Sequence, residues 1–210
     1  MREEAQVYRV EANRRERDSM QILVAEDSLK TEKSVASLSR KRWGFLRGVA
    51  RSAPQLVLTY YYPYYFQSWK ATIPKTLGRT MKLRLFTGVD GTSRSVGPAT
   101  DWPVGREMVV KAEEVIPSRI SEAEVEQLSY EYLREYVARR YRPSKPPTIE
   151  KEEFETFYVP YYGYAKENRP LHEAELVEGF TGSRGRARDV PAIYEALREG
   201  TTFTGVEEGR

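Results

Sequence analysis

The sequence predicts an α+β fold made of two divergent repeats, each an α-helix packed on an antiparallel β-hairpin or small sheet. Three observations lead to this prediction. Residues 86–96 and 180–190 share Phe, Thr, Gly, Gly, Arg and Val at matching places. Residues 61–65 and 158–162 share a Tyr-x-Pro-Tyr-Tyr pattern. A helical pattern that begins at Thr31 returns at Ser121, ninety residues later.

The repeats also set the predicted domain boundaries. A polar arm (1–20) precedes the first repeat (21–111), and the second repeat (112–199) is followed by a polar tail (200–210). Residues 1–111 hold 20 Lys/Arg and 11 Asp/Glu, a net charge of +9, whereas residues 112–210 hold 14 and 20, a net charge of −6. This asymmetry predicts an acidic partner for the first repeat, which is nucleic acid, another protein or the second repeat itself.

The first repeat opens with a helix and continues as strands. Thr31 is a suitable N-cap for a helix that runs to about Arg47. Residues 56–69 are rich in β-branched and aromatic side chains, which is typical of a long strand. Residues 81–85 alternate as a return strand does, and residues 106–115 supply a closing strand.

The predicted turn of the first repeat follows Phe86. Gly88 and Gly91 favour a tight turn there, because glycine adopts positive φ without steric cost. The corresponding glycine of the second repeat is Gly182.

The second repeat follows the same order. Ser121 and Glu124 form a capping-box pattern, which predicts a helix from Ser121 to about Tyr141. Residues 154–164 match the first aromatic strand and residues 174–180 match its return strand. A short last helix is predicted over 190–198.

The Tyr-x-Pro-Tyr-Tyr strand followed by a Thr-Gly hairpin resembles the small helix-plus-hairpin modules of the PepSY type, here duplicated. The resemblance covers roughly half of each repeat and implies the fold of the module. It implies no inhibitory or sensor role, because no functional residue of the family matches a residue here.

Composition bounds the class of protein. Cysteine is absent, which excludes disulfides and thiolate chemistry. Residues 1–5 have no apolar signal core, and the longest apolar runs, such as 56–58, are too short for a transmembrane segment. We expect a protein of the cytoplasm or of a larger particle.

No catalytic, cofactor-binding or metal-binding residue is predicted. His172 is the lone histidine, and its place beside Pro170 favours a solvated loop over a catalytic base. The glutamates of 122–135 and 150–155 fit the exposed faces of a helix and a strand better than a carboxylate pair. One histidine and no cysteine leave too few ligands for zinc.

Two basic segments are candidate binding sites. The first interleaves cations with Trp43 and Phe45 and suits phosphate binding with base stacking, or an anionic membrane surface; an amphipathic helix with a buried Trp is the alternative. The second lies on a Gly-rich turn that suits phosphate binding; the alternative is a hairpin tip with no binding role. The candidate residues are Arg40, Lys41, Arg42 and Arg47 in the first, and Arg184, Arg186 and Arg188 in the second.

Tyrosine supplies a third candidate surface. The chain has 15 Tyr against 7 Phe, and successive strand residues point to opposite faces, so a Tyr-rich strand presents rings on both. One face suits a core and the other an interface. The candidate contact residues are Tyr62, Tyr64 and Tyr161.

Together these patterns predict a non-enzymatic structural or adaptor subunit of a larger assembly. Its expected partner is a protein or a second copy of the chain, bound through charged and Tyr-rich surfaces. The alternative is a nucleic-acid-binding accessory protein that uses the basic face of the first repeat.

Overall fold

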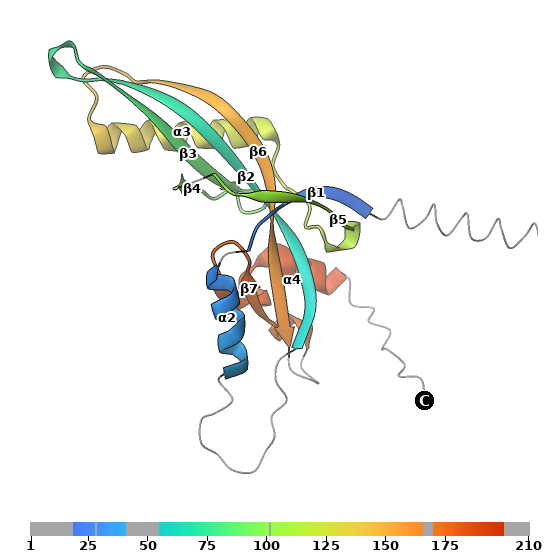
Figure 1. Ribbon diagram of the computed structural model, residues 1–210. Coiled ribbons are helices and arrows are strands. Elements are labelled where there is room, and N and C mark those ends of the chain that lie inside the picture. Colours follow the sequence, from blue (N-terminus) through green and yellow to red (C-terminus); the bar gives the residue numbers. More distant parts are fainter. Residues whose placement is uncertain (1–18, 28, 41–54, 101, 166–169, 200–210) are drawn as a thin grey trace, which may run out of the picture. The chain divides into compact units, whose positions relative to one another are not determined.

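A computed structural model of the chain describes residues 19–27, 29–40, 55–100, 102–165 and 170–199. The described part contains three α-helices and a mixed sheet of eight strands (Figure 1). The predicted α+β class is therefore confirmed. The predicted arm (1–20) and tail (200–210) lie mostly outside the described residues, although β1 begins at Ser19.

Each predicted helix and strand is present, but the sequence did not predict the strands Ser19–Ala25, Val96–Ala99 and Arg184–Arg186, and the strands predicted at 106–115 and 174–180 are shorter than expected. Residues 41–47 of the first predicted helix lie outside the described residues. The helices are α2 (Leu29–Arg40), α3 (Glu122–Tyr141) and α4 (Pro191–Glu199). The strands are β1 (Ser19–Ala25), β2 (Gln55–Pro74), β3 (Thr80–Asp90), β4 (Val96–Ala99), β5 (Gly105–Lys111), β6 (Thr148–Ala165), β7 (Glu175–Glu178) and β8 (Arg184–Arg186). The main path of the sheet runs β4-β3-β2-β6-β1-β5, and β7 joins β6 to β8.

Contacts divide the chain into two compact units. Unit 1 is Met1–Glu26 with Tyr61–Val159, and unit 2 is Asp27–Tyr60 with Pro160–Arg210. These units differ from the consecutive repeats expected at 21–111 and 112–199. The reason is the length of β2 and β6, which have 20 and 18 residues, so each strand contributes residues to both units.

The core of unit 1 lies between α3 and the long strands (Figure 1). Residues four apart on α3 form its buried stripe, which is Val125, Ser129, Leu133 and Val137. Val125 packs with Tyr65 and Val89, and Val137 packs with Ala71 and Ile73. Buried side chains that recur every four residues on the helix thus pack against side chains that recur every two residues on one face of the strand.

Strands β1 and β5 form an antiparallel ribbon in unit 1, with Ile22 opposite Met108. Ile22, Val24 and Val110 bury one face of this ribbon with Tyr61 and Tyr158.

Unit 2 packs α2 and α4 with the small strands β7 and β8. Leu176, Val177 and Ile193 are fully buried. Thr31, predicted as an N-cap, instead lies in the first turn of α2, which begins two residues earlier at Leu29. Its buried hydroxyl donates to the Gly179 carbonyl of the β7–β8 turn.

The turn predicted at Gly88 is wrong in position. Gly88 lies inside β3, opposite Phe66 and Gly97, because the alternation of β3 continues to Asp90. The chain turns at 91–95 instead, where the Asp90 amide donates to the Ser95 carbonyl at 2.9 Å.

The β3–β4 turn of unit 1 and the β7–β8 turn of unit 2 have the same local geometry. Gly91 N–H donates to the Pro63 carbonyl at 3.0 Å, and Gly179 N–H donates to the Pro160 carbonyl at 2.7 Å. Positive φ falls three residues later in each, at Arg94 (65°) and Gly182 (70°). Residues 89–95 and 177–183 therefore share this turn geometry, whereas the sequence pattern aligns 86–96 with 180–190.

Candidate functional site

The candidate tyrosines lie mainly within the fold. Tyr62 is 3% exposed, and its hydroxyl donates to Asp90 at 3.0 Å and also contacts Thr92. Burial raises the pKa of Tyr62 to about 12. Tyr64, whose ring centroid lies 5.5 Å from that of Tyr62, and Tyr161 are half-buried. Tyr62 is thus a core residue rather than the interface residue that the sequence suggested.

The turn bearing Arg184, Arg186 and Arg188 does not present three free guanidinium groups. Arg184 donates to the Ser37 hydroxyl at 2.7 Å and forms an ion pair with Glu175. It therefore ties β8 to α2 and β7 within unit 2. Arg186 and Arg188 are exposed, and Arg188 lies 3.9 Å from Asp189.

The first basic segment is mostly outside the described residues. Arg40 is the last residue of α2, and Lys41, Arg42 and Arg47 lie beyond it, in the stretch 41–54. Their part in binding stays a prediction.

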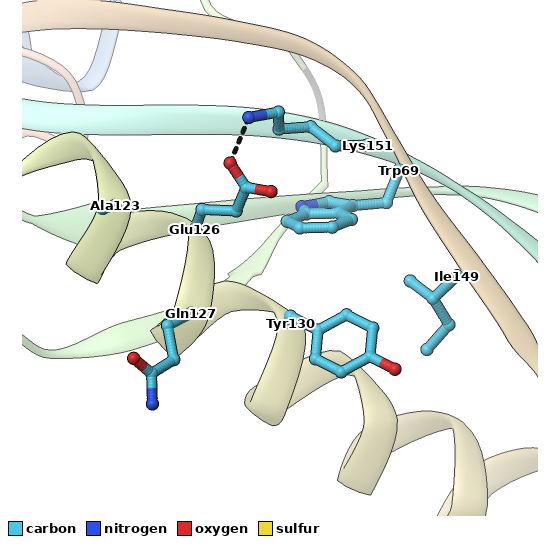
Figure 2. A pocket seen from close by; sticks show the side chains of 7 residues that line it. All are labelled: Trp69, Ala123, Glu126, Gln127, Tyr130, Ile149 and Lys151. Carbon is cyan, nitrogen blue, oxygen red and sulfur yellow. Dashed lines mark hydrogen bonds and ion pairs between the residues drawn. The ribbon is translucent and has the colours of Figure 1, made fainter.

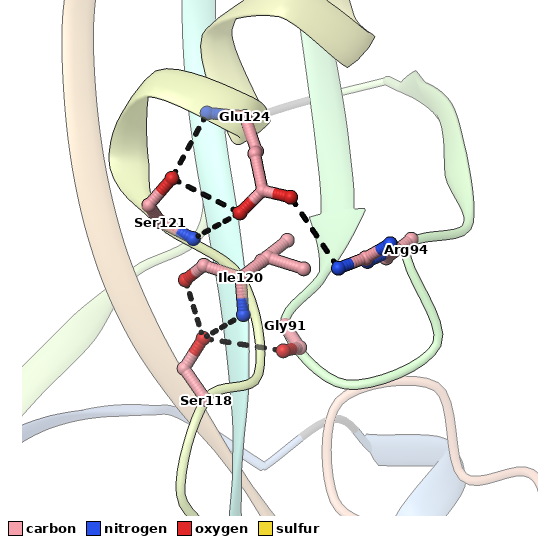
Figure 3. A network of polar contacts seen from close by, with 6 residues as sticks. All are labelled: Gly91, Arg94, Ser118, Ile120, Ser121 and Glu124. Carbon is pink, nitrogen blue, oxygen red and sulfur yellow. Dashed lines mark hydrogen bonds and ion pairs between the residues drawn. The ribbon is translucent and has the colours of Figure 1, made fainter.

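A polar network fixes the start of α3 (Figure 3). The Ser121 hydroxyl accepts from the Glu124 amide at 3.3 Å, and the Glu124 carboxylate accepts from the Ser121 amide at 3.0 Å, so the predicted capping box is confirmed. These bonds from Ser121, with Arg94 at 3.3 Å, hold the pKa of Glu124 below its usual range. The Ser118 hydroxyl lies 3.2 Å from the Gly91 carbonyl, which joins the helix start to the β3–β4 turn.

A groove opens between α3 and β6 in unit 1 (Figure 2). Its volume is about 480 Å³, and it is lined by Trp69, Ala123, Glu126, Gln127, Tyr130, Ile149 and Lys151. Lys151 and Glu126 form an ion pair across it. The Trp69 indole N–H is already donated to Thr87 at 3.1 Å, so the indole offers the groove an aromatic surface and no free donor.

Cations gather at one end of unit 1. Residues 70–82 and 139–149 contain eight Lys and Arg and no Asp or Glu. We call this cluster the basic end; its residues are Lys70, Lys75, Arg79, Lys82, Arg139, Arg140, Arg142 and Lys145.

Three contacts hold the two segments of the basic end together. The Ser144 amide donates to the Pro74 carbonyl at 3.0 Å, which joins the loop after α3 to the tip of the β2–β3 hairpin. The Lys75 ammonium donates to the Tyr141 carbonyl and lies 5.8 Å from the centre of the Tyr141 ring. The hairpin tip and the C-terminal end of α3 lie at the same end of unit 1 (Figure 1).

Most cations of the basic end face solvent. Arg139 pairs with Glu135, whereas the other exposed cations form no ion pair with any residue that the structure describes. Lys70 and Lys82 lie on the face of the hairpin opposite α3, because their neighbours Ala71 and Leu83 pack toward it. The exposed cations without an acidic partner are Lys70, Arg79, Lys82, Arg140, Arg142 and Lys145.

Leu77 stands at the apex of the basic end. It is 92% exposed, the highest value among the exposed large apolar residues described. Its φ of 63° is unusual for leucine, and Gly78 follows with a φ of 70°. The turn thus presents an apolar side chain between Lys75 and Arg79.

Sequence reasoning placed its candidate cations at residues 40–47 and 184–188 and did not single out the basic end. It treated the hairpin tip as a plain loop and overlooked residues 139–149, since they belong to the acidic second repeat. The signal was the absence of acids from both segments, which the fold then brings together.

The remaining observations concern His172, metal-binding groups and the helices. His172 is exposed on a short 3-10 helix, 6.3 Å from Tyr194 between ring centroids. Among the described residues, no group of three His, Cys, Asp or Glu side chains is placed to hold a metal ion. None of the described helices has the length and apolarity needed to cross a membrane.

Comparison with family models, curated proteins and solved structures found no match to this chain. The resemblance to PepSY-type modules accordingly stays a prediction.

Proposed function

We propose that this protein is a non-enzymatic structural or adaptor subunit of a larger assembly, in the cytoplasm or within a particle, that docks through the basic end of unit 1. The observation that carries the proposal is the gathering of solvent-facing cations around an exposed Leu77. The like charges gathered at this end repel one another, and a solvent-exposed leucine side chain contributes no hydrophobic free energy to folding. An acidic partner that covers the apex relieves both costs.

The predicted duplication belongs to the same proposal. The matching bonds of Gly91 to Pro63 and of Gly179 to Pro160 support two divergent repeats. The Tyr-x-Pro-Tyr-Tyr pattern is shared by β2 and β6, which pair with the strands that precede these turns, β3 and β7. The first repeat supplies residues 70–82 of the docking surface through its long hairpin, and the second repeat supplies residues 139–149.

A nucleic-acid-binding accessory protein is the second candidate. It is favoured by the acid-free composition of both segments of the basic end, since a phosphate backbone offers closely spaced negative charges over a long distance.

Charge reversal tests the docking role. Arg79→Glu, Lys82→Glu, Arg140→Glu and Lys145→Glu change exposed side chains only, so circular dichroism should show an unaltered fold. A matched control reverses four exposed cations elsewhere, at Lys30, Lys33, Arg106 and Lys111. We expect affinity purification from the native source to lose the principal partner with the first variant and keep it with the second. A folded first variant that retains its full assembly contradicts the proposal.

A further inference from the structure

We propose that the basic end binds double-stranded nucleic acid, with the β2–β3 hairpin tip in a groove and Leu77 against the base edges or a base step. This inference rests on the proposed docking role of the basic end and names its partner. It is carried by three properties of that surface, which are its charge, its shape and its single apolar projection.

The charge suits a phosphate array. The six cations without an acidic partner among the described residues come from the hairpin, the end of α3 and the loop after it, so they lie on three parts of the basic end instead of following one element. A duplex presents phosphates on both sides of each groove. Cations on the hairpin and on the loop of residues 142–147 are placed to contact separate phosphates while the tip lies between them.

The shape suits a groove. Strands β2 and β3 pair without interruption from Tyr64 opposite Asp90 to Pro74 opposite Thr80. Behind the tip, β2 is also bonded to β6 and covered by α3, so the part that can enter a groove is the narrow turn of residues 75–79. The major groove admits elements as wide as a two-stranded ribbon. The bond from the Ser144 amide to the Pro74 carbonyl anchors the tip on the loop after α3, so the surface is largely formed before binding.

The apolar projection distinguishes a duplex from a membrane. Binding at a lipid surface needs several large apolar side chains to enter the interface. Here Leu77 projects alone, and the next apolar residue, Met81, is only 37% exposed. A single apolar side chain has a target in either groove, which is the thymine methyl in the major groove and a base step unstacked by a wedge from the minor groove.

The test uses the full chain and a fluorescein-labelled DNA duplex of about 30 base pairs, which spans about three helical turns. We expect binding, measured by fluorescence anisotropy, to weaken linearly with the logarithm of salt concentration. Reversal of Arg79, Lys82, Arg140 and Lys145 should weaken binding by about 100-fold or more and reduce the salt slope by up to about 4. The control reversal of Lys30, Lys33, Arg106 and Lys111 should leave both values near wild type.

A second variant tests the wedge separately from the charge. Leu77→Asn keeps the charge and tolerates positive φ. It should retain the salt slope while it lowers affinity and abolishes any bend, which energy transfer between dyes at the duplex ends would report.

The outcomes separate this inference from the proposed function. If wild type does not bind the duplex while the reversed variant still loses its native assembly, the docking role stands and the nucleic-acid inference is overturned. Wild-type binding to phosphatidylserine vesicles without duplex binding also overturns it, in favour of a lipid surface. Duplex binding that is equal in wild type and the basic-end variant overturns it as well.

Discussion

At the residue scale, the buried polar groups of unit 1 differ in whether they form a hydrogen bond. The Tyr62 hydroxyl is satisfied by Asp90 and Thr92. The Gln67 amide and the Ser129 hydroxyl are fully buried and form no hydrogen bond within the described structure. An unpaired buried polar group costs more free energy than a satisfied one contributes. Removal of the Tyr62 hydroxyl should therefore destabilise the protein, whereas removal of the Ser129 hydroxyl should stabilise it.

Tyr62→Phe should destabilise the protein by about 1–2 kcal/mol at neutral pH, since it removes the bond to Asp90 and leaves Asp90 with fewer donors. The folded pKa of about 12 exceeds the ordinary value of 10.0, so folding favours the neutral phenol. This contribution is complete below pH 10 and is lost as pH rises through 12. Urea unfolding at a series of pH values should show the wild type losing more stability than the variant above pH 10. Parallel curves would contradict this assignment.

Ser129→Ala should stabilise the protein by up to about 1 kcal/mol, because it removes an unpaired buried hydroxyl and raises helix propensity. The matched control is Ser118→Ala, whose hydroxyl bonds to the Gly91 carbonyl at 3.2 Å, and which should destabilise. Chemical denaturation of both variants gives the comparison. A destabilised Ser129→Ala would mean that its hydroxyl has a partner.

At the element scale, α3 illustrates how much the sequence could predict. The capping box and the stripe from Val125 to Val137 specify a helix and its buried face, because both depend on residues within four positions. The predicted turn included Gly88 and Gly91, and only Gly91 lies in it, since Gly88 suits a turn equally well by local conformation. What decides between them is distant: the Gly91 amide reaches the Pro63 carbonyl, and no local pattern encodes that contact.

The basic end could be predicted in part for the same reason. Its acid-free composition is visible in the sequence, but its two segments lie about 60 residues apart and meet only in the fold, through the Ser144 to Pro74 bond and the contacts of Lys75 with Tyr141. The exposure of Leu77 depends on the positive φ at the tip, and a leucine in the sequence does not predict a positive φ.

Glycine substitutions test the corrected turns. Gly182→Ala should destabilise the protein by about 1–3 kcal/mol, because its φ is 70° and a Cβ would lie 2.7 Å from the Lys30 backbone carbon. Gly88→Ala is the control in a strand, where a Cβ would meet the Phe66 ring at an ordinary 3.6 Å. Its stability by thermal melting should stay near wild type. Equal losses of stability at both positions would instead favour the alignment of residues 86–96 with residues 180–190.

At the scale of the whole molecule, two strands decide how the chain folds. Residues 55–60 of β2 belong to unit 2 and residues 61–74 to unit 1, and β6 is divided in the same way at Pro160. Each unit also draws on two separate stretches of sequence. Neither unit corresponds to a continuous segment that would be complete on its own.

The shared strands lead us to expect a single cooperative unfolding transition. Trp69 and Trp102 lie in unit 1, whereas Gly182 lies in unit 2. In a Trp43→Phe background, which removes the third tryptophan, Gly182→Ala should lower the urea midpoint reported by tryptophan fluorescence as much as that reported by circular dichroism. The physical reason is that loss of the β6–β7 pairing at Tyr161–Tyr164 frays a strand whose other half supports the core of unit 1. Two separate transitions, with the tryptophan midpoint unmoved, would show instead that the strands divide into independent folding units at the boundary near Pro160.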